Sequence, residues 1–241
     1  VLRPRSAYNI ALQRRDPGPD GTLNTSDDGG RVTVYDYDAA YRGAAFVQQV
    51  QVNSDTIERY HTIETMVSRR LMGGWMAQAS GFATKNHRWI EQQFQTPNDD
   101  AFPLDETWNW GMNFSGMYLL PGDVRFAGFL QAKKGVTGQR TNIFRAPDPD
   151  GGTPLRQLST VTLRMEPYGS QQGDMITSTN LRVSKDFRMN GGRRVSFDVD
   201  LFNLFNSGVP TSITWQSGPQ FGAINEVLSP RIVRFGGRFS F

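Results

Sequence analysis

The sequence of 241 residues contains no cysteine, only two histidines and no long apolar run. Without cysteine there is no disulfide framework, no thiolate nucleophile and no cysteine metal site. No stretch approaches the roughly 18 consecutive apolar residues that a membrane-spanning helix needs. The formal net charge is only +3. Because the basic residues are also scattered along the chain, the sequence gives no sign of a nucleic-acid partner.

The pattern that the sequence does have is alternation. In residues 230–241, Val233, Phe235 and Phe239 share one parity, whereas Arg234 and Arg238 share the other. Successive side chains of a strand point to opposite faces, so this stretch is predicted to be a strand with one apolar and one polar face. With this last one, the predicted strands are residues 4–15, 56–72, 75–90, 106–120, 124–139, 173–188, 193–206 and 230–241.

The connections between these strands alternate between short and long. Short turns lie at 73–74, 121–123 and 189–192, and long loops rich in Gly, Pro, Asp and Ser lie at 16–54, 91–105, 140–172 and 207–229. In an antiparallel meander this order places all short turns at one end and all long loops at the other. That asymmetry is typical of outer-membrane barrels, whereas a soluble sandwich does not sort its loops in this way. We therefore predict an all-β fold, a transmembrane antiparallel up-and-down β-barrel of about eight strands. A soluble β domain is the alternative.

Aromatic residues near the strand ends fit the same prediction. Trp108 and Tyr118 share a parity and lie ten residues apart, which is roughly 25 Å along the normal of a tilted strand and matches the lipid-facing band. Trp75 and Trp89 bracket the neighbouring strand. An ordinary core would explain the shared parity but not the placement near strand ends. The predicted membrane-interface aromatics are Trp75, Trp89, Trp108, Tyr118, Phe239 and Phe241.

The loop at 16–30 has the spacing of oxygen ligands in a calcium loop. With Asp16 at position 1, Asp20 stands at position 5, Thr22 offers its carbonyl at position 7 and Asp27 stands at position 12. Position 3 is Gly18, which has no side-chain ligand. The alternative interpretation is a solvated acidic turn, and both stay open. Calcium is the only cofactor or metal that the sequence suggests.

No arrangement of residues indicates catalysis. His61 lies mid-strand on the lipid-facing parity and His87 lies near the end of another strand, so neither is placed for a nucleophile–base pair. The paired carboxylates at 27–28 and 99–100 lie in loops with no apolar pocket to raise a pKa. We therefore expect that the protein is not an enzyme.

Three stretches resemble a known family. They are 181–187 (LRVSKDF), 198–207 (DVDLFNLFNS) and 230–241 (PRIVRFGGRFSF). Together they resemble the carboxyl-terminal end of TonB-dependent outer-membrane receptors, particularly the Oar-like group with a carboxypeptidase-regulatory-like amino-terminal domain. The last stretch also matches the family's outer-membrane assembly signal, at Arg234, Gly236, Phe239 and Phe241.

The resemblance implies a larger assembly than this sequence. The family's barrels have 22 strands and a plug, whereas nothing here resembles the plug or the energy-coupling box. We therefore expect this chain to be the last part of such a barrel. Its expected partners are outer-membrane lipid, the barrel-assembly machinery, and a plug domain, further barrel strands or other subunits. The implied function is to form the wall of a receptor that takes up a bulky nutrient. The implied location is the outer membrane of a Gram-negative-type cell, with the carboxyl terminus on the periplasmic side. The alternative is a structural or adhesive outer-membrane protein whose outside loops bind a partner or calcium.

Overall fold

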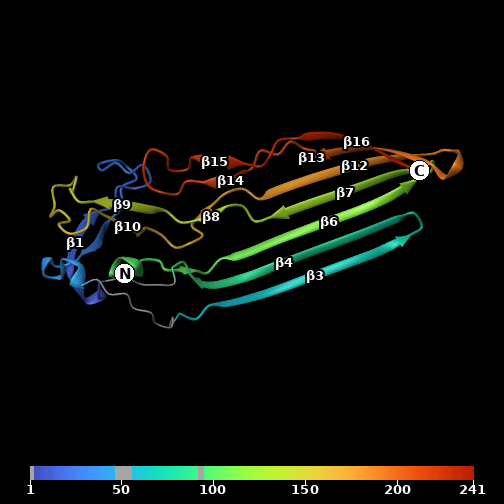
Figure 1. Cartoon of the computed structure of the whole chain (residues 1–241). Helices are drawn as coiled ribbons and strands as arrows, with labels where there is room; N and C mark the ends of the chain where they lie inside the picture. Colours follow the sequence, from blue (N-terminus) through green and yellow to red (C-terminus); the bar gives the residue numbers. More distant parts are fainter. Residues whose placement is uncertain (1–2, 47–55, 92–94) are drawn as a thin grey trace.

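The structure is a computed structural model that describes residues 3–46, 56–91 and 95–241. Over these residues the chain is all-β (Figure 1). The helical pieces are single 3-10 turns: η1 (Arg5–Ala7), η2 (Ala39–Tyr41), η3 (Ala44–Phe46), η4 (Pro97–Asp100) and η5 (Asn190–Gly192). Within the described ranges, no helix has the length and apolar character to cross a membrane.

One large sheet dominates the molecule. Its long strands are β3 (Arg59–Met72), β4 (Trp75–Trp89), β6 (Trp108–Leu120), β7 (Val124–Lys133), β12 (Ile176–Arg188), β13 (Arg194–Phe202) and β16 (Ile232–Ser240). The order is β16-β13-β12-β7-β6-β4-β3, and every neighbouring pair is antiparallel. A short strand, β5 (Leu104–Asp105), pairs with the end of β4. The predicted meander is therefore confirmed.

Short turns lie at one end of this sheet and long connections at the other (Figure 1). Gly73 and Gly74 join β3 to β4 with φ of 65° and 83°, which is the left-handed backbone that a two-residue hairpin requires. The chain also crosses quickly from β6 to β7 and from β12 to β13, and these turns lie at the same end as the carboxyl terminus.

The predicted first strand is not part of the large sheet, so that prediction was wrong. Within residues 4–15, β1 (Ile10–Arg15) pairs with β2 (Arg31–Asp36) in a separate two-stranded sheet. Leu12 and Arg14 of β1 are buried among the loops, whereas most side chains of the large sheet are at least partly exposed. The large sheet thus has seven long strands instead of eight.

The long connections contain further short hairpins. Within the long loop predicted at 140–172, β10 (Thr160–Arg164) pairs with β9 (Thr141–Arg145). The pairs β8 (Thr137–Gly138) with β11 (Gln171–Gln172) and β14 (Pro210–Ile213) with β15 (Ile224–Val227) were not predicted. Within the long loop predicted at 16–54, β2 pairs with β1, and the segment 47–55 lies outside the described residues.

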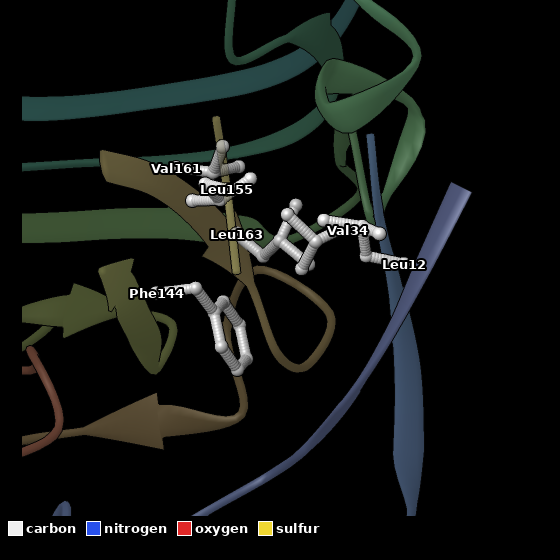
Figure 2. Close-up of a cluster of buried hydrophobic side chains, with 6 residues drawn as sticks. All are labelled: Leu12, Val34, Phe144, Leu155, Val161 and Leu163. Atoms are coloured by element: carbon white, nitrogen blue, oxygen red, sulfur yellow. The ribbon is translucent and has the colours of Figure 1, made fainter. Parts of the chain in front are cut away.

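The hydrophobic core sits among the loops and not on the sheet (Figure 2). It is built from residues of β1, β2, β9 and β10 and from one residue of the loop between β9 and β10. Its members are Leu12, Val34, Phe144, Leu155, Val161 and Leu163. The large sheet is a single open layer, and in β3 every side chain except that of Arg69 is exposed. No closed barrel forms within the described residues, because β3 and β16 are the two edges.

Candidate functional site: the two faces of the sheet and its loop end

One face of the large sheet is a continuous apolar surface. The register places Val67, Ala79, Phe114, Leu130 and Thr179 in one row across five strands. At the two edges of the sheet the apolar side chains are the most open, with Val67 73% exposed and Phe235 78% exposed. A contiguous apolar surface of this extent marks a site that contacts another apolar phase or partner.

The predicted interface aromatics lie at both ends of this face. Trp75 and Tyr118 are cross-strand partners near the short turns, and Trp108 lies at the loop end opposite Lys85. Phe239 also lies near the short turns and stacks on Phe241, with ring centroids 5.8 Å apart. Trp89 differs, because it pairs with Leu104 of β5 and is half-buried. The position of these rings in a membrane stays a prediction, as does the assembly signal at 234–241.

Cations border the same face. At the short-turn end, the Arg69 guanidinium lies 3.9 Å from the centroid of the Trp75 ring, and the Lys185 ammonium donates to the carbonyl of Gly122. At the loop end, His61 is opposite Lys85. His61 is therefore near the start of β3, not mid-strand as predicted. His87, near the end of β4, contacts the Glu106 carboxylate.

The opposite face is polar, and its half near the short turns is an ion-pair network. Asp200 accepts hydrogen bonds from Arg182 Nε at 2.5 Å and from Arg234 Nε at 2.9 Å, so one carboxylate joins three strands. Asp198 accepts from Ser184 Oγ at 2.5 Å. Asp186 of β12 lies 3.3 Å from the nearest guanidinium nitrogen of Arg125 in β7.

The half of the polar face near the loops is mostly uncharged. Thr62 and Thr84 share a hydrogen bond of 2.9 Å, and Gln131 donates to Asn113 at 3.1 Å. Beside them the Phe82 ring is 40% exposed. A half-open pocket of about 390 Å³ includes Phe82, Asn113 and Gln131 in its lining. Phe82 was not predicted as a site residue, although an aromatic residue on a polar parity was a signal that could have identified it.

In the predicted calcium loop, Asp16 is held by an arginine. Arg140 donates from both terminal nitrogens to the Asp16 carboxylate, at 2.9 and 2.6 Å, and also to Ser217 Oγ at 3.0 Å. The hydrogen bond from Arg140 to Asp16 raises the pKa of Arg140 despite its burial. This cation joins the 16–30 loop to the 215–217 segment.

The other predicted ligands are held by the loop itself. Asp20 accepts from the backbone N–H of Thr22, and Asp27 accepts from the backbone N–H of Asp20 and from Thr25 Oγ1. The hydrogen bond from Thr25 lowers the pKa of Asp27. Among the described residues, no three acidic or histidine side chains gather as a metal site. The calcium hypothesis stays a prediction, and the observed contacts are those of a loop that is braced by its own amides and by Arg140.

Asp36 fastens two loops at the same end of the molecule. Asp36 is 1% exposed, and its carboxylate accepts from the backbone N–H groups of Arg156 at 2.7 Å, Gln157 at 2.9 Å and Leu158 at 3.1 Å. A fourth donor is the N–H of Tyr37 at 2.9 Å. Charged acceptors are stabilised by several backbone donors. Asp36 therefore holds the 156–158 segment against β2.

Comparison with known proteins identifies no relative. No family model, no curated protein and no solved structure matches the chain. Function is therefore inferred from the sheet, its loops and the residues described above.

Proposed function

We propose that the chain forms part of the wall of an outer-membrane β-barrel in a TonB-dependent receptor-like protein that takes up a bulky nutrient. The observation that carries the proposal is the single-layered antiparallel meander with one continuous apolar face and one polar face. In a soluble sheet, the apolar face packs against a core. Here the buried core lies among the loops instead, and lipid is the environment that matches an uncovered apolar face.

The sorting of the connections also supports the proposal. Short turns and long loops lie at opposite ends of the sheet, as they do in barrels that insert through the membrane from the periplasmic side. Under the proposal, the short turns and the carboxyl terminus face the periplasm. The polar face then borders an aqueous interior, where a plug domain would contact the ion-pair network around Asp200.

A second function is favoured by the loop end. Its own buried core and the backbone donors around Asp36 make these loops a folded platform. A rigid platform suits a structural or adhesive outer-membrane protein that binds a partner. The two proposed functions, uptake and attachment, are distinguished by deleting the gene for this protein in its native cell. Loss of nutrient uptake supports the receptor, and loss of attachment with normal uptake supports the adhesive function.

The membrane proposal is tested by cysteine scanning, because the natural chain has no cysteine. Single variants Val233→Cys and Phe235→Cys probe the apolar face, and Arg234→Cys and Gly236→Cys probe the polar face. The chain is inserted into phospholipid vesicles and treated with a water-soluble maleimide. We expect slow labelling on the apolar parity and fast labelling on the polar parity. Equal labelling rates of all four variants in vesicles would overturn the proposal. The control is labelling of the same variants unfolded in urea, which measures the intrinsic reactivity of each cysteine.

A further inference from the structure

The pocket on the polar face lies over the centre of the sheet, near the loops. The register brings Phe82 of β4, Gly111 of β6 and Lys133 of β7 into one row. In the next row toward the short turns, Asn113 is directly opposite Gln131. The pocket of about 390 Å³ is lined by these five residues and by Asn109, among others. An aromatic ring, three amides and a cation therefore converge on one open depression.

Gly111 makes room for the Phe82 ring. A Cβ at position 111 would lie 2.8 Å from Phe82 Cε1, closer than such contacts occur in proteins. The ring therefore rests over the glycine, and 40% of Phe82 stays exposed. An exposed aromatic ring above a flat backbone is a platform on which another flat, partly apolar ring can lie.

The charged residues that line the pocket have one sign, and Glu64 of β3, the register partner of Phe82, lies on the side of that ring away from Lys133. The lining of the pocket includes Lys133 and Lys134 and contains no Asp or Glu. The Lys134 ammonium donates to the carbonyl of Trp108 at 2.7 Å. Lys133 is exposed, and within the described part of the chain it makes no ion pair at 4.0 Å or less. Its charge is therefore open to a ligand, unlike those of Arg125, Arg182 and Arg234, which are paired with Asp186 or Asp200.

We propose that this pocket binds a sugar ring that carries a carboxylate, as a uronic acid unit of an oligosaccharide does. The apolar face of a pyranose ring lies on Phe82, its hydroxyl groups bond to the amides of Asn109, Asn113 and Gln131, and its carboxylate pairs with Lys133. The site rests on the proposed function, because the polar face must border water for the sugar to reach it.

The test is calorimetric titration of the full chain in detergent micelles with trigalacturonate, and with maltotriose as the neutral sugar. We expect trigalacturonate to bind and maltotriose to bind at least about tenfold more weakly, since only the former can pair with Lys133. Lys133→Gln should remove this preference. Phe82→Ala and Gly111→Ala should each weaken trigalacturonate about tenfold, and Phe82→Tyr should preserve binding.

Phe129→Ala is the matched control, because Phe129 is an exposed aromatic residue on the same face outside this pocket. Its affinity for trigalacturonate should match that of the natural chain. The inference is overturned if neither sugar binds, if Phe82→Ala binds as tightly as the natural chain, or if citrate competes as well as trigalacturonate does. None of these results would change the alternating maleimide labelling expected for the cysteine variants of β16. Failure of the sugar site is therefore distinguished from failure of the membrane proposal.

Discussion

Asp36 shows how one buried carboxylate organises distant backbone. Four N–H groups converge on it, three of them from residues 156–158. In the variant Asp36→Asn, an NH2 group replaces one of the two carboxylate oxygens. This NH2 group cannot accept hydrogen bonds from the backbone N–H groups that it faces. We expect a loss of about 2–3 kcal/mol in the stability of the loop end. Hydrogen exchange at the amides of Arg156 and Leu158 should rise at least about tenfold.

The matched control is Asp38→Asn, two residues away. Asp38 caps the short turn η2 by accepting from the N–H of Ala40 at 2.8 Å. Because Asn is as good a cap as Asp, this change should alter stability by less than about 0.5 kcal/mol. If Asp36→Asn exchanges no faster than Asp38→Asn, Asp36 does not hold the two loops together.

Asp105 gives the loop end a pH dependence. Burial raises the pKa of Asp105, but hydrogen bonds from Arg88 Nε at 2.8 Å and from Thr107 outweigh burial and lower the pKa overall. A carboxylate with a lowered pKa contributes its stability above the unfolded pKa, and the contribution is lost as the pH falls through the folded value. We expect the 104–107 corner to loosen as the pH falls below about 4.

This expectation is measured by hydrogen exchange at Thr107, corrected for the intrinsic effect of pH on exchange. The Asp105→Asn variant has no carboxylate at this position, so its corner should already be loose at neutral pH and should show a flatter pH response. The comparison extends down to about pH 3, which is below the ordinary pKa of an aspartate. If the amide of Thr107 is equally protected from exchange in both proteins over this range, Asp105 does not stabilise the corner.

At the scale of elements, the turn between β3 and β4 depends on its two glycines. Both have positive φ, where a Cβ costs about 1 kcal/mol or more. The double change Gly73→Ala with Gly74→Ala should therefore destabilise the hairpin by about 2 kcal/mol. The measurement is the midpoint of urea unfolding in detergent micelles.

Gly237→Ala is the control for this hairpin. Gly237 lies in β16 with φ outside the left-handed region, and a methyl group at this position would meet only open space. The midpoint of this variant should stay close to that of the natural chain. Gly73→Asn should also be tolerated, since Asn adopts positive φ more readily than Ala. Equal shifts in all three variants would mean that the turn geometry does not set the effect.

The long strands were predictable because alternation over many residues is a strong signal. In β6, large apolar side chains at the even positions 108–114 alternate with small or polar ones at the odd positions 109–115, and this fixes both the strand and its faces. The short strands of the loops are different. β9 and β14 have five and four residues, too few for a period to emerge from a single sequence.

Contacts between distant segments were not predictable from the pattern. For β1, alternation identifies two faces but does not say that Leu12 packs with Phe144 and Leu163 instead of facing outward from the large sheet. Asp36 finds three of its four donors 120 or more residues away. Spacing within the 16–30 loop suggested ligands but did not reveal that Arg140 binds Asp16.

At the scale of the molecule, the number of strands decides how the proposed barrel wall would be completed. In a meander of seven strands, the first and the last run in the same direction, as β3 and β16 do (Figure 1). Pairing β3 with β16 would therefore insert a parallel pair into an antiparallel sheet. Single-chain bacterial barrels have even numbers of strands. We therefore predict that the large sheet does not close on itself and that further strands pair with its two edges.

Disulfide trapping in vesicles tests this prediction. The double variant Val67→Cys with Phe235→Cys places one cysteine on each edge strand, and Val199→Cys with Phe235→Cys places them on register partners in β13 and β16. Under mild oxidation the second pair should form an intramolecular disulfide in high yield, whereas the first should form none within one chain. Because lipid cannot satisfy the backbone groups of an open edge, the first pair should instead link neighbouring chains or added strands. A high yield of intramolecular disulfide between residues 67 and 235 would mean that seven strands close alone.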